Sequence, residues 1–330
     1  MRVNKMDITV FVVLLAVAVC IGIIIFMGIF KEILDVSTFG FFNAKISGLK
    51  SRINEHSKIM EMDLYELENF MAKFDRDFKK DFKNIAESSP DGVEIFFRKF
   101  GLRYEKEILK NILRGIEVEP YGFFTREMIT KLQQTPISEY SSKLEGTAYS
   151  KLSFNKPLAE IERDIDFLYY REILSAAQQT DSKNAAVLKI YIKSEIDVRN
   201  VLTILRCKKY GVENVLDHVI PIGYEVPEWK LKNLAEARDV EGVLDLLTDT
   251  DYKFLLELKE KYLETKSLFI FEKALKKYLL DMAKKLAIIH PYTAAKALYY
   301  IVLREKEVTD ILGIYEAKKE EFGVILEEII

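Results

Sequence analysis

The sequence predicts an all-α protein in which three related helical units follow one amino-terminal transmembrane helix. Three observations support this prediction. Glycine and proline are scarce, with 14 and 7 among 330 residues, which disfavours a β-sandwich with many turns. One helical pattern occurs three times along the chain, which is typical of an assembly of similar units. Residues 8–30 carry no charged side chain.

The amino-terminal element is residues 8–30, an apolar run of about 23 residues. At about 1.5 Å per residue, a helix of this length crosses a hydrocarbon core of about 30 Å. A secretory signal has a shorter apolar region followed by a cleavage site, and a buried core helix is rarely apolar on every face. We therefore expect residues 1–34 to form a retained membrane anchor. More positive charge follows the span than precedes it, which favours a cytoplasmic carboxy-terminal domain.

The first helical unit is expected at residues 41–120, after a short linker at residues 35–40. A densely charged helix should follow, and three phenylalanines spaced by four predict its buried side: Phe74, Phe78 and Phe82. Further along, Asp91 is followed three residues later by Glu94, the spacing of a reciprocal helix cap. A new helix should therefore begin near Asp91.

The second and third units are expected at residues 121–215 and 216–330. A long helix of the second unit should open after Pro157, because proline is tolerated in a first helical turn but not inside a helix. The third unit begins with the strongest turn signal in the chain, the glycine- and proline-containing residues 221–227. This turn is the clearest boundary between units.

The repeated pattern is an acidic residue followed four and seven positions later by apolar residues, with basic residues near the end. At about 3.6 residues per turn these positions share one helical face. The copies are Glu105, Leu109 and Ile112; Asp197, Val201 and Ile204; and Glu307, Ile311 and Ile314. The middle copy lies in residues 190–211, and the pattern predicts that the three helices have comparable places in the fold.

Composition limits the function classes. A formal charge of −3 with 31% charged residues indicates a well solvated surface of mixed sign and no excess of cations for nucleic acid. The two cysteines, Cys20 and Cys207, cannot form a disulfide framework, and Cys207 should be a small buried apolar residue. A protein or a membrane is the expected partner.

No motif predicts catalysis. The sequence contains no glycine-rich phosphate loop and no nucleophile elbow. His56, His218 and His290 are far apart in sequence, and none has a second histidine at helical spacing. We therefore expect no catalytic residue, no metal, no cofactor and no small-molecule substrate.

The candidate partner-binding residues are basic and lie on or near the three repeated helices. They are Arg114, Arg199, Arg206, Lys208, Lys209, Lys318 and Lys319. The alternative is that such residues only balance the negative charge at helix carboxyl ends, which contributes about 0.3–1 kcal/mol each. If they form a surface, they should influence association and specificity more than total affinity.

Several stretches resemble a known family. Asn43, Ala44, Ser51 and Arg52 in FFNAKISGLKSRI match its opening helix, with Lys45 where arginine is usual. IDVRNVLTILRCKKYG matches its second pattern through Asp197, Asn200, Leu205, Arg206 and Lys208. HPYTAAKALYYIVLREKEVTDILGIYEAKKEEF resembles its ending. With the threefold organisation, the chain is similar to the C subunit of archaeal-type (A-type) rotary ATP synthases, the counterpart of the d subunit in vacuolar-type ATPases.

This resemblance implies a non-catalytic connector shaped as a funnel or socket of three helical units. Its base would sit on the cytoplasmic face of the rotating proteolipid ring, and its cavity would receive the central stalk and pass torque to it. A part that turns with the ring cannot carry a membrane helix outside it, so residues 8–30 should lie in or over the central hole of the ring. The alternatives are a membrane-tethered helical adaptor or scaffold outside a rotary ATPase, and a membrane-bound enzyme.

Overall fold

The computed structural model describes residues 5–50, 59 and 61–319, and no β-strand occurs within them. Ser51, Arg52 and His56 lie outside this description. The longer helices are α1 (Lys5–Lys50), α3 (Leu64–Ser88), α4 (Val93–Phe100), α5 (Leu102–Leu113), α6 (Arg126–Gln133), α8 (Leu158–Gln178), α9 (Ser182–Tyr210), α10 (Glu228–Glu236), α13 (Phe269–Ile289) and α14 (Ala295–Lys319). The predicted all-α class is therefore confirmed.

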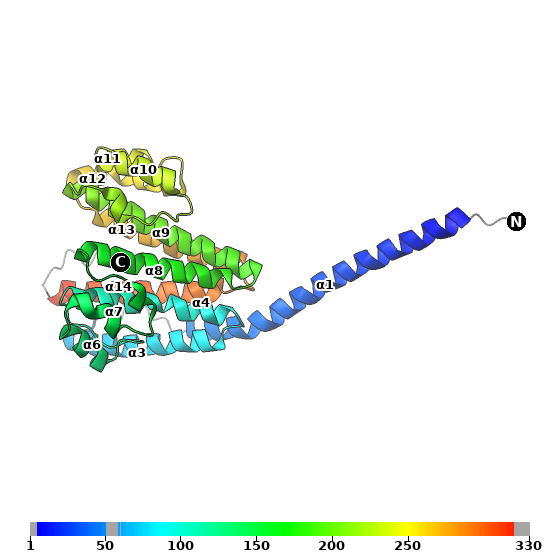
Figure 1. Cartoon of the computed structure of the whole chain (residues 1–330), viewed down its shortest axis with the longest axis horizontal. Helices are drawn as coiled ribbons and strands as arrows, with labels where there is room; N and C mark the ends of the chain where they lie inside the picture. The colour runs from blue at the N-terminus through cyan, green and yellow to red at the C-terminus, as the bar shows by residue number, and fades with distance from the viewer. Residues whose placement is uncertain (1–4, 51–58, 60, 320–330) are drawn as a thin grey trace.

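Shorter helices connect these elements. They are α7 (Tyr140–Lys143), α11 (Val240–Asp245), α12 (Lys259–Thr265) and the 3₁₀ helices η1 (Ile137–Glu139), η2 (Ala148–Lys151), η3 (Val215–His218) and η4 (Asp251–Leu258). Figure 1 shows the result as a helical body from which the amino-terminal part of α1 extends alone. The carboxyl end of α14 lies at the side of the body away from α1.

The linker expected at residues 35–40 is wrong, because α1 continues through it to Lys50. This part of the chain stays helical since its apolar residues meet the body at helical spacing: Phe39, Phe42, Ile46 and Leu49 are all buried. Asn43 Nδ2 also donates a hydrogen bond to the carbonyl oxygen of Pro291, at 2.5 Å. Tertiary packing therefore overrides the local turn signal.

The transmembrane helix is not confirmed. Among the side chains that the structure describes, no helix is apolar over the length needed to cross a bilayer. The predicted span at residues 8–30 lies within α1, and the side chains of residues 8–16 are outside the described ones.

The helices α3, α4 and α8 show how local sequence set their ends. Asp63 and Glu66 form a reciprocal cap at the start of α3, and Phe74, Phe78 and Phe82 are buried as predicted. A helix does begin near Asp91, since α4 starts at Val93, but the predicted cap is wrong: the residue before α4 is Gly92, with φ of +80° and no side-chain cap. Helix α8 begins directly after Pro157, as predicted.

Helix α9 is the central element of the body. It begins at the capping residue Asp181, whose Oδ1 accepts backbone hydrogen bonds from Lys183 and Asn184, and it ends at Gly211 with φ of +66°. Over its 29 residues it packs against α8, α13 and α11. Its first half belongs to the largest apolar core, and its second half belongs to a separate core with α10 and α13.

Candidate functional site

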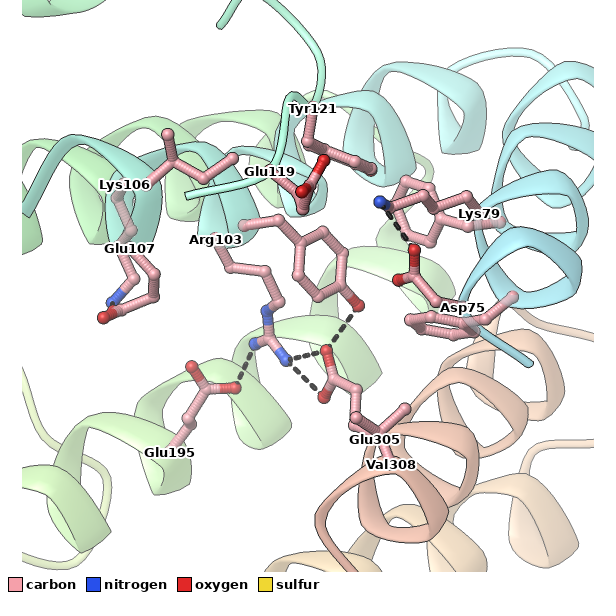
Figure 2. Close-up of a pocket in the computed structure, with 14 residues that line it drawn as sticks. Asp75, Lys79, Arg103, Lys106, Glu107, Glu119, Tyr121, Glu195, Glu305 and Val308 are labelled. Carbon is pink, nitrogen blue, oxygen red and sulfur yellow. Dashed lines mark hydrogen bonds and ion pairs between the residues drawn. The ribbon is translucent and has the colours of Figure 1, made fainter. Parts of the chain in front are cut away.

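A charged cluster joins three helices that are far apart in sequence. Arg103 of α5 donates from Nη1 to both carboxylate oxygens of Glu305 on α14, at 3.1 and 2.8 Å, and from Nη2 to Glu195 on α9. Figure 2 shows the guanidinium group between the two carboxylates. Burial alone lowers the pKa of Arg103, but Glu195 and Glu305 outweigh it and raise that pKa above its usual range. The cation is therefore permanent.

The members of this cluster occupy matching positions in the repeated pattern. Arg103 lies two residues before Glu105, Glu195 two before Asp197, and Glu305 two before Glu307. The sequence pattern alone did not single out these residues, although counting back from each repeated acid would have found them. Three residues of one sign would repel one another at this point, and a single arginine between two glutamates avoids that repulsion.

Tyrosine hydroxyl groups complete the cluster. Tyr104 donates to Glu305 Oε1 at 2.6 Å, and Tyr170 donates to Glu195 Oε1 at 3.0 Å. Burial and then the charge of Glu305 raise the pKa of Tyr104, so its hydroxyl stays protonated and remains a donor. Each carboxylate is thus held by Arg103 and by one tyrosine, which makes the cluster a rigid junction.

A cavity of about 480 Å³ opens beside the cluster, between α3, α5, α9 and α14. Its apolar lining is Phe78, Phe82, Tyr104, Ile108, Tyr121 and Val308. The ring centroid of Tyr104 lies 5.9 Å from that of Phe78, 5.8 Å from that of Phe82 and 5.3 Å from that of Tyr121, and the rings meet edge to face.

The charged lining of the cavity is five carboxylates, Asp75, Glu107, Glu119, Glu195 and Glu305, and three cations, Lys79, Arg103 and Lys106. Figure 2 shows the Asp75–Lys79 pair across the cavity from Arg103.

Two of the repeated acids hold the loops that follow their helices. Asp197 Oδ2 accepts backbone hydrogen bonds from Tyr224 at 3.0 Å, Glu225 at 2.7 Å and Val226 at 3.4 Å. Glu105 Oε1 accepts one from Phe123, at 3.0 Å. The predicted turn at residues 221–227 is therefore fastened to α9 by a buried carboxylate.

Each of these two loops places a glycine in close contact with the acidic residue that accepts its backbone hydrogen bonds. The segments Pro120–Tyr121–Gly122–Phe123 and Pro221–Ile222–Gly223–Tyr224 share a Pro-x-Gly-aromatic order. A Cβ added at Gly122 would overlap the Glu105 carboxylate, and one added at Gly223 would overlap the Asp197 carboxylate. Burial raises the pKa of both acids, that of Asp197 to about 6. The third acid, Glu307, is buried and accepts a hydrogen bond from Arg304 at 2.7 Å.

The predicted basic residues have different partners within the chain. Arg114 donates two hydrogen bonds to Glu162, at 2.6 and 2.7 Å, and Arg199 pairs with Asp166 at 2.5 Å. Because Glu162 and Asp166 lie one turn apart on α8, these two ion pairs are neighbours along that helix. Two further cations, Lys106 and Lys110, pair with Asp166, and its pKa is lowered because these charges outweigh its burial.

The other basic residues make separate contacts. Arg206 pairs with Glu272 of α13 at 2.9 Å, and Lys208 donates to the carbonyl oxygen of Ala235 at 2.5 Å. Lys209 is exposed above the ring of Tyr210. At the end of α14, Lys318 donates to the carbonyl oxygen of Met62, and Lys319 is exposed above the ring of Tyr315.

The remaining predictions from the sequence concern metal and cysteine chemistry. Within the described ranges, no group of three or more His, Cys, Asp or Glu side chains is arranged to hold a metal ion. Cys207 is buried, as predicted, and Cys20 is exposed.

The fold and the site define a helical protein in which helices from distant parts of the chain converge on one partly open cavity. Residues 124–323, more than half of the chain, match the family described as ATP synthase (C/AC39) subunit. The chain belongs to this family.

Curated relatives agree with this assignment. The chain is 27% identical over 340 aligned residues to the C subunit of the A-type ATP synthase of Methanocaldococcus jannaschii, covering 88% of this chain and 85% of the relative. It is 24% identical to the protein of the same name from Methanobrevibacter smithii, covering 94% and 92%. A third, from Methanosarcina acetivorans, is 30% identical over 67% of this chain and 65% of its own length. The resemblance drawn from the sequence is therefore confirmed.

Proposed function

We propose that this chain is the non-catalytic connector of an A-type or V-type rotary ATP synthase. It seats the central stalk on the membrane proteolipid ring and transmits the torque that couples proton or sodium transport to ATP synthesis or hydrolysis. The observation that carries this proposal is the convergence of α5, α9 and α14 on one charged junction beside a cavity. A rigid junction of this kind suits a part that transmits force between partners.

The three-unit socket is part of the same proposal. It is supported by the matching positions of Arg103, Glu195 and Glu305 and by the Pro-x-Gly loops that Glu105 and Asp197 hold. In this arrangement the units at residues 41–120, 121–215 and 216–330 surround the axis on which the stalk is seated.

We further propose that residues 8–30 anchor the chain in the membrane, inside the ring's central hole, with the body on the cytoplasmic side. The apolar side chains described between Val17 and Ile29 are exposed, from 49% at Val17 to 69% at Ile24, so they need an apolar environment. Cys20 is exposed and Cys207 is buried, so a thiol crosslinker should react at Cys20. Crosslinks from Cys20 to the outer, lipid-facing side of ring subunits would contradict this placement.

The basic residues remain proposed contacts of the stalk. Arg206 and Lys209 are the exposed members near the end of α9. The variant Arg206→Glu/Lys208→Glu/Lys209→Glu should weaken stalk docking and leave the helical content by circular dichroism unchanged. Undiminished docking would assign these residues to helix-end stabilisation alone.

Comigration with ATPase activity tests the proposed function. After membranes are solubilised in detergent, the tagged chain should purify together with ATP-hydrolysing subunits. A membrane-tethered adaptor or scaffold outside a rotary ATPase, which is the alternative function, would elute without that activity. Recovery of the folded chain with no ATPase subunit would overturn the connector proposal.

A further inference from the structure

The carboxylate of Asp197 on α9 is fully buried, and only neutral groups donate to it. Four donors reach its Oδ2 atom. They are the backbone N–H groups of Tyr224, Glu225 and Val226 and the hydroxyl group of Tyr252, which lies 3.2 Å away. Asp166, which is almost as buried, instead pairs with three cations. A negative charge on Asp197 is therefore stabilised by dipoles alone, although burying a carboxylate without a counter-ion is costly.

The second carboxylate oxygen of Asp197 has no hydrogen-bond donor. Within the described part of the chain, Oδ1 is buried and has no partner. The backbone of Gly223 packs against it, since a Cβ added at Gly223 would come 2.1 Å from this oxygen. When Asp197 is ionised, Oδ1 is desolvated without a compensating hydrogen bond, whereas a bound proton removes the charge.

The third copy of the repeated pattern has a cation at a position where the second copy has a serine. Arg304 lies three residues before Glu307, as Ser194 lies three residues before Asp197. Arg304 Nη1 donates to Glu307 Oε2 at 2.7 Å, and both side chains are buried. Because a serine hydroxyl supplies no positive charge, the second copy lacks this built-in counter-charge. A proton can neutralise Asp197 instead.

Acids and hydroxyl groups lie around Asp197 on the elements packed against it. They are Glu225 on the loop, Asp251 and Tyr252 on η4, and Tyr278 on α13. On α10, the buried Lys230 pairs with Asp249. Glu225 and Asp251 add negative charge to this region, which disfavours a further charge on Asp197.

We propose that the loop at residues 221–227 is a pH-sensitive latch on α9, which is closed while Asp197 holds a proton and opens more often once that proton is lost. In the closed loop the pKa of Asp197 is about 6, and opening to water would restore the ordinary value of about 3.9. Between these values the closed loop binds more protons than the open loop. Opening therefore becomes more frequent as the pH rises through this range.

The latch acts on an exposed aromatic surface. Tyr224 on the loop is 45% exposed, and Trp229, in the first turn of α10, is 59% exposed. Because the loop leads directly into α10, its release changes how these two side chains are presented. The inference goes beyond the proposed connector function, since the latch is a property of this chain alone.

Amide hydrogen exchange of the full-length, detergent-solubilised chain tests the latch. The probes are the backbone amides of Tyr224, Glu225 and Val226, with each rate divided by that of an unprotected amide at the same pH. Their opening should increase about 10-fold between about pH 5 and about pH 8, with a plateau above about pH 7. Low urea concentrations should barely change it, because a local opening exposes little surface. Exchange at buried α9 amides such as Val201 should accelerate in urea.

Three variants identify the titrating group. Asp197→Asn should remove the pH dependence, because asparagine does not titrate. Asp217→Asn makes the same change at an exposed position on η3 and should retain the pH dependence. Tyr252→Phe removes a donor that stabilises the ionised carboxylate, so the midpoint of the pH dependence should move to higher pH. A purely structural role of Tyr252 would not move this midpoint.

The latch is contradicted by any of three results. Opening of the loop amides in the wild type could be independent of pH, or it could keep the same pH dependence in Asp197→Asn. Urea could also accelerate exchange at the loop amides as steeply as at Val201, which would show that the loop opens only when the whole chain unfolds.

Discussion

At the scale of single residues, the loop after α9 depends on Gly223. A Cβ at this position would overlap both the Asp197 carboxylate and the carbonyl oxygen of Val226. Because the overlapped atoms are buried or belong to the backbone, Gly223→Ala should lower the free energy of unfolding by about 1–3 kcal/mol. Urea denaturation measures this loss.

Gly242→Ala is the matched control for this substitution. Its Cβ would meet Asp239 and Ala237 at 3.5 and 3.6 Å, which are ordinary contacts. The control should therefore be nearly neutral or slightly stabilising, since alanine favours the helix. Equal losses in the two variants would show that the loop does not depend on close approach to Asp197.

The raised pKa of Asp197 predicts a pH dependence of stability. Its folded-state pKa of about 6 exceeds the unfolded value of about 3.9, so between these values the folded state binds more protons than the unfolded state. The contribution of this residue is therefore present below about pH 4 and lost as the pH rises through about 6, amounting to at most about 3 kcal/mol.

The variant Asp197→Asn isolates this effect, because asparagine does not titrate. The stability of the wild type relative to Asp197→Asn should fall between about pH 4 and pH 6 and stay constant above that range. Urea denaturation across this pH series is the measurement. A constant difference at every pH would mean that Asp197 has an ordinary pKa in the folded chain.

At the scale of elements, Asp166 connects α5, α8 and α9 through Lys106, Lys110 and Arg199. Its side chain is 2% exposed, so Asp166→Ala would leave three cations without their common partner. The expected loss of unfolding free energy is about 3–5 kcal/mol. Asp164→Ala, two residues earlier on a more exposed pair with Lys156, should lose less than about 1 kcal/mol. Similar thermal unfolding of both variants would contradict the bridging role.

Element boundaries were predictable where they depend on local chemistry. Pro157 opens α8 as expected, because its missing N–H is unused in a first turn. The linker predicted at residues 35–40 is wrong because packing keeps this segment helical. The cap predicted at Asp91 is wrong because Gly92, with a positive φ, is the residue before α4. At residues 35–40, tertiary contacts such as the burial of Phe39 and Phe42 override the local preference for a turn.

At the scale of the whole molecule, Arg103 holds together helices from three parts of the chain. Arg103→Leu should lower the free energy of unfolding by about 3–5 kcal/mol, because Glu195 and Glu305 would face each other in a mostly buried site. Adding Glu195→Gln and Glu305→Gln should restore part of that stability by removing the repulsion. Denaturation of the single and triple variants tests this, and no recovery in the triple variant would show that the repulsion is not the cause.

The sequence by itself determined the helical class, the buried phenylalanine face of α3 and the three copies of one pattern. These follow from periodicity and composition, which act over a few residues and can be read without a fold. Only the tertiary structure decided that Arg103, Glu195 and Glu305 meet and that Glu105 and Asp197 hold the following loops. It also divided the predicted basic residues among ion pairs, hydrogen bonds to backbone carbonyl oxygens and exposed positions. The physical reason is that charge pairing depends on distances between atoms, and helix packing sets those distances between residues far apart in the chain.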